Sequence, residues 1–304
     1  MKLKCSMKKI LVSGLLNTET TTSVRGFPVN YYPIDYTFFG IDTAVSGVAF
    51  NIAKALRTLG DEVCLTSMVG KDFSASYIEN TLNTLDISTE NILSTLQQTP
   101  SSVVLYDSDG KRQIYCDLKD IQESNYPFDA KLLEDVDLVV ACNINYNRPL
   151  LHLAKKAGKL IATDVHVLSD IYDEYNKEFM EFADILFLSD EKIGDDYQAF
   201  LWQLAHTYNC KIIVLGRGSK GAAIYLQETD QISEIPAVSV GKVLNTVGAG
   251  DALFSSFLHF YIKGYEPMKA LHLAQVFAAH KITANGGAKG FVTEDVITNW
   301  TNDK

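Results

Sequence analysis

The chain has 304 residues, of which 47% are hydrophobic and 21% charged. This is ordinary globular composition, and a chain of this length can bury a sizeable core as one large domain or two modest ones. A net charge of −10 disfavours nucleic acid or an anionic membrane as a partner, because the overall field would repel either one.

Short apolar runs typical of buried strands alternate with helical patterns along most of the chain. Strands are predicted at 8–14, 62–70, 136–143, 159–165, 183–189 and 210–216. Helices are predicted at 49–60, 74–85, 148–158, 178–182 and 197–208, followed by two long apolar helices at 251–264 and 268–286. This alternation favours an α/β fold whose mostly parallel sheet is covered on both faces.

Two segments interrupt the alternation and predict a small β appendage. Residues 18–45 show no helical period, and residues 101–118 contain two strand patterns around Asp109-Gly110, which is a strong hairpin signal. The predicted division is an α/β core of residues 1–17, 46–100 and 119–304, with an appendage of residues 18–45 and 101–118.

Residues 46–60 form the first motif of interest, in which small residues lead into a helix with Asn51 near its start. One interpretation makes Asn51 a capping residue or a polar residue of the helix. The other makes it a ligand-binding side chain beside the room that Gly47 leaves open.

Polar residues follow two of the later strands, at the edge of the sheet where α/β sites gather. They are Asn143, Asn145 and His166. Each has two open interpretations, a ligand contact or a purely structural role.

Residues 216–221, Gly-Arg-Gly-Ser-Lys-Gly, match Gly-x-Gly-x-x-Gly literally. A dinucleotide fingerprint opens a helix, whereas a strand pattern follows here, which argues against a nicotinamide oxidoreductase. A P-loop is excluded because no Gly-Lys-Ser/Thr is present. Two interpretations remain: a plain hairpin turn, or a turn whose backbone N–H groups meet a nucleotide's phosphates.

Residues 245–251, Asn-Thr-Val-Gly-Ala-Gly-Asp, lead directly into a predicted helix. A helix N-terminus attracts anions through its unpaired N–H groups and partial positive charge. The small residues Gly248, Ala249 and Gly250 let a phosphate approach the backbone closely. Asp251 is interpreted either as the helix N-cap or as a base for a hydroxyl that attacks a phosphoryl group.

The five cysteines are widely spaced, and no Cys-x-x-Cys pair occurs; they are Cys5, Cys64, Cys116, Cys142 and Cys210. This pattern argues against a disulfide framework or a zinc site and indicates buried, reduced thiols in a cytoplasmic protein. The first apolar run is too short for a signal peptide, and no stretch approaches the length of a membrane span.

Taken together, these motifs resemble the PfkB, or ribokinase-like, carbohydrate kinases over essentially the whole chain. Residues 245–251 match the C-terminal signature Asp/Asn-Thr-x-Gly-Ala-Gly-Asp. Residues 46–53, Ser-Gly-Val-Ala-Phe-Asn-Ile-Ala, resemble the N-terminal signature Gly-Gly-x-x-x-Asn-x-Ala with serine in the first position. Residues 218–221 match the Gly-x-x-Gly turn that contacts ATP. The resemblance implies a ribokinase-like three-layer sandwich with the appendage as a β-sheet lid.

The resemblance also implies an activity: transfer of the γ-phosphate of ATP, with Mg²⁺, to a hydroxymethyl group of a sugar or a nucleoside. Asp251 would be the catalytic base, and the backbone of Gly248, Ala249 and Gly250 would form the anion hole. The implied substrate-binding residues are Asn17, Glu19, Gly47 and Asn51. The implied ATP-binding residues are Ser189, Lys192, Gly218, Lys220, Gly221, Asn285 and Gly287, with the last two near the adenine. No protein metal ligand is assigned.

Family members often dimerise through the lid, so the resemblance implies a homodimer. The apolar residues Tyr31, Tyr32, Phe38 and Phe39 in the appendage are compatible with such an interface.

Three departures from the family pattern qualify these roles. Glu19 stands where an aspartate is usual, which lengthens the side chain by a methylene. Ser189 and Lys192 replace both ends of an Asn-x-x-Glu motif linked to magnesium and phosphate, so the way magnesium is held stays open. Asn245 and Val247 remove oxygens where many members bind a monovalent cation, so activation by potassium is also open. The altered magnesium motif motivates an alternative function, a non-catalytic sugar or nucleotide sensor.

Overall fold

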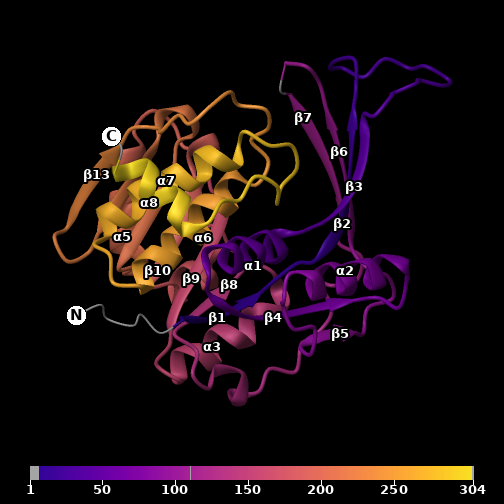
Figure 1. Cartoon of the computed structure of the whole chain (residues 1–304). Helices are drawn as coiled ribbons and strands as arrows, with labels where there is room; N and C mark the ends of the chain where they lie inside the picture. The colour runs from indigo at the N-terminus through magenta and orange to yellow at the C-terminus, as the bar shows by residue number, and fades with distance from the viewer. Residues whose placement is uncertain (1–6, 110, 303–304) are drawn as a thin grey trace.

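A large sheet runs through the middle of the molecule in the computed structural model, which describes residues 7–109 and 111–302 (Figure 1). Its strands are β1 (Lys9–Ser13), β4 (Glu62–Val69), β5 (Ile92–Ser94), β8 (Leu138–Ala141), β9 (Leu160–Val167), β10 (Ile185–Ser189), β11 (Ile212–Gly216), β12 (Ala222–Leu226) and β13 (Gln231–Ile235). Within the described residues they form nine strands in the order β13-β12-β11-β10-β9-β8-β1-β4-β5. All neighbours pair in parallel except β12 and β13 at one edge, which confirms the mostly parallel sheet.

Helices cover both faces of this sheet and complete the predicted three layers. The helices on one face are α1 (Val48–Leu59), α2 (Phe73–Thr84), α6 (Ala249–Ile262), α7 (Pro267–Lys281) and α8 (Glu294–Asn302). On the other face lie α3 (Arg148–Lys156), α4 (Lys177–Phe182) and α5 (Tyr197–Tyr208). Short 3-10 turns occur at η1 (Ala130–Leu133), η2 (Asn145–Asn147), η3 (Asp190–Lys192) and η4 (Gly218–Lys220).

The strands are buried on both faces, which is why they read as continuous apolar runs. In β1, Ile10 and Val12 pack with α1, α6 and α7, whereas Leu11 packs with α3, α4 and α5. This alternation is the period of two that a pleated strand imposes.

The predicted elements are present, but some of their ends differ. The predicted helix 268–286 ends at Lys281 instead, because the chain leaves it through Gly286 and Gly290, which have φ of 96° and 83°. The sequence also failed to predict β5, β13 and α8, which are short or mixed in polarity.

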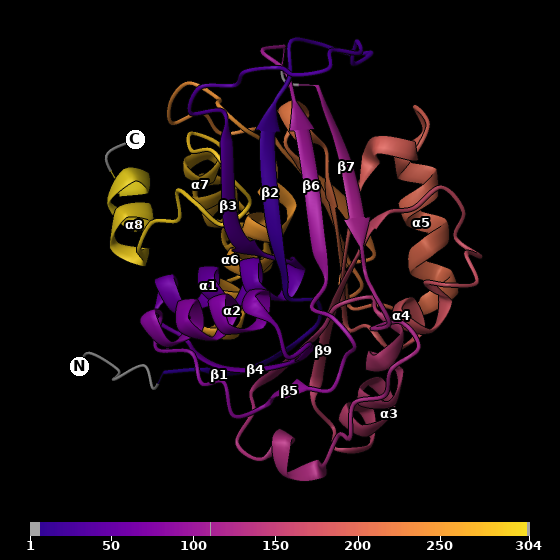
Figure 2. The same cartoon turned by 90° about the vertical axis from the view of Figure 1, so that its right-hand side faces the viewer.

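A second, smaller sheet is built from the two segments predicted as the appendage. Its strands are β2 (Asn17–Ser23), β3 (Ile41–Ser46), β6 (Ser101–Tyr106) and β7 (Arg112–Asp117). Figure 2 shows them side by side in the order β3-β2-β6-β7. The predicted hairpin is confirmed by the antiparallel pairing of β6 with β7, although Gly110 of its turn lies outside the described residues.

Two contacts tie this small sheet, the lid, to loops of the core. Arg112 of β7 donates to the Thr246 hydroxyl at 3.0 Å. Lys289 donates to Asp42 of β3 at 2.7 Å. The lid therefore touches the segment that leads into α6.

Cys64, Cys116, Cys142 and Cys210 are free thiols, while Cys5 lies outside the described residues. Cys142 and Cys210 are buried as predicted, but Cys116 is exposed because it lies on a lid strand, and Cys64 is only partly buried. Among the residues that the structure describes, no helix combines the length and apolar character needed to cross a bilayer.

Candidate active site

The N-termini of α1 and α6 bring Asn51 and Asp251 together. Asn51 donates a hydrogen bond from Nδ2 to Asp251 Oδ2 at 2.7 Å, and only 5% of Asn51 is exposed. The start of α1 depends on Gly47, whose φ is 103° and whose absent Cβ would lie 2.4 Å from the Leu15 carbonyl oxygen. Glycine therefore lets the chain turn tightly against β1 and place Asn51 one turn later.

Gly248, not Asp251, occupies the N-cap position of α6. Its φ is 76°, and a Cβ there would lie 2.2 Å from the carbonyl oxygen of Gly287. Asp251 stands in the first turn of the helix, makes no capping hydrogen bond and uses its carboxylate to accept from Asn51. The N-cap interpretation of Asp251 is wrong. The capping interpretation of Asn51 is also wrong, because Gly47 occupies the N-cap position of α1.

The predicted anion hole is only partly free. The N–H group of Ala249 donates to the Thr246 carbonyl at 3.1 Å, and the N–H group of Val247 donates to Asn245 Oδ1 at 2.8 Å. These bonds shape the turn into α6, while Gly250 faces open space. An anion at this helix N-terminus would therefore depend on Gly248 and Gly250 more than on Ala249.

Two carboxylates near this point have altered acidity. Burial raises the pKa of Asp251, and the hydrogen bond from Asn51 with the charges of His166 and Lys281 opposes part of the rise. Burial also raises the pKa of Glu19, although a hydrogen bond from Ser46 at 3.4 Å opposes it. A carboxylate with a raised pKa is a better proton acceptor at neutral pH than an ordinary one.

The substrate side of the site carries two unsatisfied acceptors. Asn17 donates to Ser102 at 3.1 Å, yet its Oδ1 is buried without a hydrogen-bond partner. Oδ1 of Asn51 is also buried and unpartnered. A buried acceptor left without a donor costs about 1–3 kcal/mol, so a ligand hydroxyl at either atom would be stabilised.

The Gly-x-x-Gly motif forms the turn between the antiparallel strands β11 and β12, as both remaining interpretations require. The N–H group of Arg217 donates to the Gly221 carbonyl at 2.8 Å. A strand follows, so the dinucleotide-binding hypothesis is wrong. Gly221 has φ of 99° and a Cβ would lie 2.1 Å from the Ile235 carbonyl oxygen, while Gly218 and Lys220 are exposed.

Arg217 is a residue of this edge that the sequence did not single out. Its guanidinium carbon lies 3.8 Å from the centroid of the Tyr197 ring, and it donates to Glu234 at 2.8 Å. Ser189 is used locally, since its hydroxyl accepts from the N–H group of Glu191 at 3.4 Å, and Lys192 is exposed.

The predicted adenine-side residues separate in the structure. Asn285 is exposed, whereas Gly287 is buried against Gly248 and the amide of Asn51. Gly287 therefore lies beside the Asn51–Asp251 pair. Of the two residues predicted near the adenine, Asn285 is the one whose exposure leaves it accessible to a nucleotide.

Asn143 and Asn145 have partners within the protein, which is consistent with a structural role for both. Asn143 donates to Asn176 at 3.0 Å, and the Asn145 carboxamide oxygen accepts from Arg148 at 3.3 Å. His166 differs, because it adopts φ of 58° at an irregularity between β9 and β10 and influences the charge state of Asp251. Its role stays open.

Lys281 is the residue at this site that sequence reasoning missed. It ends α7 with no exposed surface, close enough to influence both Asp251 and Glu19. A lysine inside an otherwise apolar helical pattern was the available signal, because lysine is almost never fully buried without a partner.

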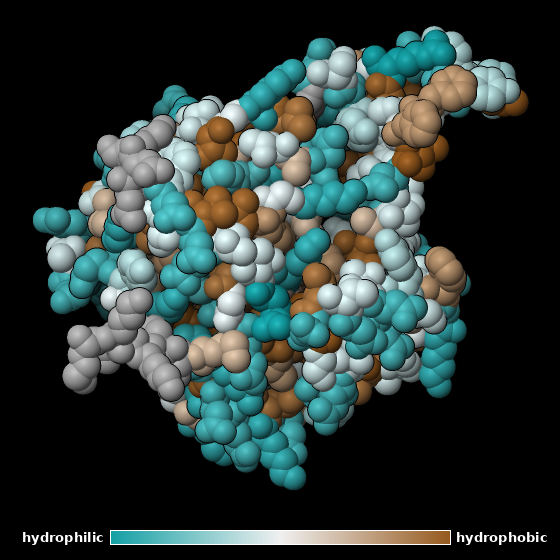
Figure 3. All heavy atoms as spheres, viewed as in Figure 1, coloured by the Kyte–Doolittle hydropathy of each residue, from teal (hydrophilic) through white to brown (hydrophobic). Residues whose placement is uncertain are grey.

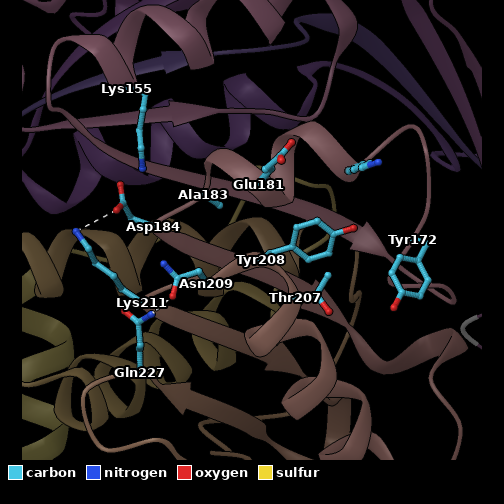
Figure 4. A pocket seen from close by; sticks show the side chains of 11 residues that line it. Lys155, Tyr172, Glu181, Ala183, Asp184, Thr207, Tyr208, Asn209, Lys211 and Gln227 are labelled. Carbon is cyan, nitrogen blue, oxygen red and sulfur yellow. Dashed lines mark hydrogen bonds and ion pairs between the residues drawn. The ribbon is translucent and has the colours of Figure 1, made fainter.

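A hollow of about 650 Å³ lies elsewhere, where the chain enters β10 and β11 (Figure 4). Lys155, Asp184, Tyr208 and Lys211 line it, and Lys211 pairs with Asp184 at 3.0 Å. None of the predicted site residues lines this hollow. The candidate active site lies instead at the carboxyl ends of the parallel strands, which is where α/β proteins bind ligands.

The arrangement defines a class of protein: an α/β sandwich with a β-sheet lid and a partly buried carboxylate in the first turn of a helix. The family model described as pfkB family carbohydrate kinase matches residues 7–294. The chain belongs to this family, and it is a phosphotransferase with an alcohol group as acceptor.

Individual relatives cover nearly the whole chain. A nucleoside kinase of Methanocaldococcus jannaschii is 27% identical over 283 residues, which are 89% of this chain and 91% of that protein. A microbiome-derived acarbose kinase has a similar structure, with a TM-score of 0.85 and 21% identity over 96% of this chain and 98% of its own. Arabidopsis thaliana ribokinase complexed with ribose and ATP gives a TM-score of 0.79 and 17% identity, covering 96% of this chain and 98% of its own.

Proposed function

We propose that the chain is an ATP-dependent kinase that phosphorylates a hydroxymethyl group of a sugar, with a nucleoside as the alternative acceptor. The observation that carries this proposal is the pairing of Asn51 with Asp251 at the N-terminus of α6. A carboxylate with a raised pKa, beside N–H groups that attract a phosphate, has the parts needed for phosphoryl transfer.

Asp251 serves as the base in this proposal. It accepts the proton of the substrate hydroxyl as that oxygen bonds to the γ-phosphorus and the bond to the β–γ bridging oxygen breaks, releasing ADP. The N–H groups at Gly248 and Gly250, together with the α6 dipole, stabilise the charge on the transferred group. Asn51 holds the carboxylate in place.

The substrate would lie between the lid and α1. The unpartnered Oδ1 atoms of Asn17 and Asn51 accept from donors, and the Glu19 carboxylate accepts as well. Gly47 leaves room for the ligand beside them. A surface rich in acceptors suits a polyhydroxylated ligand, which both sugars and the ribose of nucleosides provide.

ATP is proposed to lie along the edge formed by Ser189, Lys192, Gly218, Lys220, Gly221 and Asn285, with Gly287 closest to the transferred phosphate. Within the described residues, no group of three or more His, Cys, Asp or Glu side chains is placed to hold a metal ion. Mg²⁺ is therefore proposed to be held by the triphosphate and its own waters, as is usual for this ion.

The test is ADP release over a panel of sugars and nucleosides, with Asp251→Asn as the variant. Asp251→Asn should abolish turnover and leave ATP binding largely intact, because only the proton acceptor is lost. Near-normal activity in this variant would contradict the role of Asp251. Ligand-induced thermal stabilisation without ADP release for any compound would instead support a non-catalytic sensor.

The lid is also proposed to form a homodimer interface. Figure 3 shows apolar side chains gathered at the projecting end of the lid. The large exposed apolar residues of this segment are Val29, Tyr31, Tyr32, Ile34, Tyr36, Phe38, Phe39 and Ile41. Such a group is typical of an interface, and a second copy of the chain is the proposed partner. A cytoplasmic location remains a prediction.

A further inference from the structure

Lys281 is a buried charge that the proposed mechanism has not used. It is the last residue of α7 and has 0% exposed surface. Its ammonium donates to the backbone carbonyl of Asn245 at 3.4 Å. Burying a charged group costs free energy, so the Lys281 ammonium needs neighbours that stabilise its charge.

That environment is the candidate active site itself. The carboxylates of Asp251, on α6, and Glu19, on β2, face Lys281 and stabilise its charge, while Arg112 of the lid opposes it. The positive charge of Lys281 therefore lies near two partly buried carboxylates; burial raises the pKa of Glu19, and the charge of Asp251 adds to that rise. Asn245 begins the segment that ends in the Gly248 turn and Asp251.

We propose that Lys281 is a positioning residue for phosphoryl transfer. Its ammonium anchors the Asn245 carbonyl, and thereby the whole turn of residues 245–250, while it balances the charges of Glu19 and Asp251. This inference rests on the proposed kinase function. In this role, the Lys281 ammonium keeps residues 245–250 in the conformation that receives the phosphoryl group.

A purely structural role of Lys281 and a positioning role lead to different expected results. If Lys281 only supported folding, its loss would lower thermal stability without a selective effect on kcat. If it positions the turn, its loss lowers kcat more than it raises the KM values, because the turn acts on the transferred group. A small free cation that reaches the vacated space should then restore part of the rate.

The protonation of Lys281 gives a second test that needs no variant. Burial lowers the pKa of Lys281 to about 8, although Asp251 and Glu19 oppose that fall. The charged form is present below this value and disappears above it. The kcat of the unmodified protein should therefore decline as the pH rises through about 8.

The experiment compares Lys281→Met, Lys281→Arg and the unmodified protein in ADP release at pH 7, with KCl exchanged for choline chloride at constant ionic strength. Lys269→Met is the matched control, because it removes an exposed lysine from the same helix. The unmodified protein and the control should be indifferent to the exchange. Lys281→Met should lose kcat on the order of 100-fold, the loss typical of one removed electrostatic contact, and regain part of it in KCl.

Several outcomes would overturn the inference. One is a folded Lys281→Met protein with kcat within twofold of the unmodified protein. Another is strong activation of the unmodified protein by KCl, because a free cation would then be needed beside Lys281. If neither Lys281 variant folds, a kcat that stays constant between pH 7 and 9.5 in the unmodified protein would also overturn it. No ADP release from the unmodified protein with any acceptor would instead remove the proposed function and the inference with it.

Discussion

Asn51 and Asp251 are 200 residues apart in the sequence, yet the Asn51 amide donates to the Asp251 carboxylate at 2.7 Å. This bond joins the first turns of α1 and α6, the two helices that carry the family's signatures. It opposes the rise in the pKa of Asp251 that burial causes, so the environment of this carboxylate depends on both halves of the chain.

Replacing Asn51 should weaken the base without removing it. Asn51→Ala deletes a hydrogen bond to a charged group, which is worth about 1.5–3 kcal/mol, or roughly a 10- to 100-fold loss of kcat/KM. Asn51→Asp adds a like charge, which raises the pKa of Asp251 and moves the acid limb of the kcat–pH profile to higher pH. Profiles that coincide with that of the exposed control Asn83→Ala would contradict this role.

The turn at Gly248 should tolerate no side chain. Gly248→Ala places a Cβ 2.2 Å from the Gly287 carbonyl oxygen at a φ of 76°, so both the melting temperature and kcat should fall. Gly250→Ala is the comparison, because nothing lies within 4 Å of its Cβ position. It should keep the melting temperature and lose activity only through obstruction of the phosphate. Equal melting temperatures for the two variants would count against this account of the turn.

Arg112 should help to close the lid over the site. Its hydrogen bond to Thr246 links β7 to the turn before α6 and is exposed, so its removal should cost about 1 kcal/mol, or roughly fivefold in kcat/KM. Arg112→Ala should also raise ADP release in the absence of an acceptor, because a looser lid admits water. Lys111→Ala, one residue earlier, serves as the control, and an unchanged ratio of coupled to uncoupled turnover would contradict the role.

The lid tip should control the oligomeric state. Tyr36 and Phe38 are 75% and 86% exposed, and their rings stack with centroids 6.4 Å apart. Tyr36→Ser with Phe38→Ser should convert a dimer into a monomer without lowering the melting temperature of the core, as measured by sedimentation and calorimetry. If the unmodified protein is monomeric at micromolar concentration, the proposal of a lid-mediated dimer is contradicted.

A buried charged cluster should make stability depend on pH. His259, 1% exposed, bonds to Asp61 at 2.7 Å and lies 3.4 Å from Glu294. Burial alone would lower the pKa of His259, but the two carboxylates raise it above its ordinary value. Its contribution to the free energy of unfolding is complete below the unfolded pKa of about 6.5 and is lost as the pH rises through the folded value.

Glu294 contributes in the opposite direction. The His259 imidazole 3.4 Å away and the hydrogen bonds from Lys263 lower the pKa of Glu294 to about 2, so its contribution is present above 4.5 and is lost as the pH falls toward 2. Stability from this cluster should be greatest between these limits. Urea unfolding of His259→Asn should show less loss of stability from pH 6.5 to 9 than the unmodified protein, and parallel curves would contradict the assignment.

Local patterns in the sequence were sufficient for the layers of the fold and for the family. The strands of the sheet are buried on both faces, so each one is a short apolar run regardless of its neighbours. The turn at residues 245–251 is likewise local, because small residues before a helix expose its N–H groups wherever the helix packs. The same reasoning identified Asp251 but did not decide whether it is a helix N-cap or a catalytic base.

Only the tertiary structure excluded the N-cap role of Asp251 and showed which residues surround it. The partner of Asp251 comes from α1, the burial of Lys281 comes from the packing of α7 against the 245–250 turn, and Gly287 is placed by the loop after α7. None of these relationships follows from periodicity, because each depends on which residues distant in the chain become neighbours. The sequence by itself therefore determined the class of the protein and the identity of the candidate base, whereas its charge environment exists only once the strands and helices have packed.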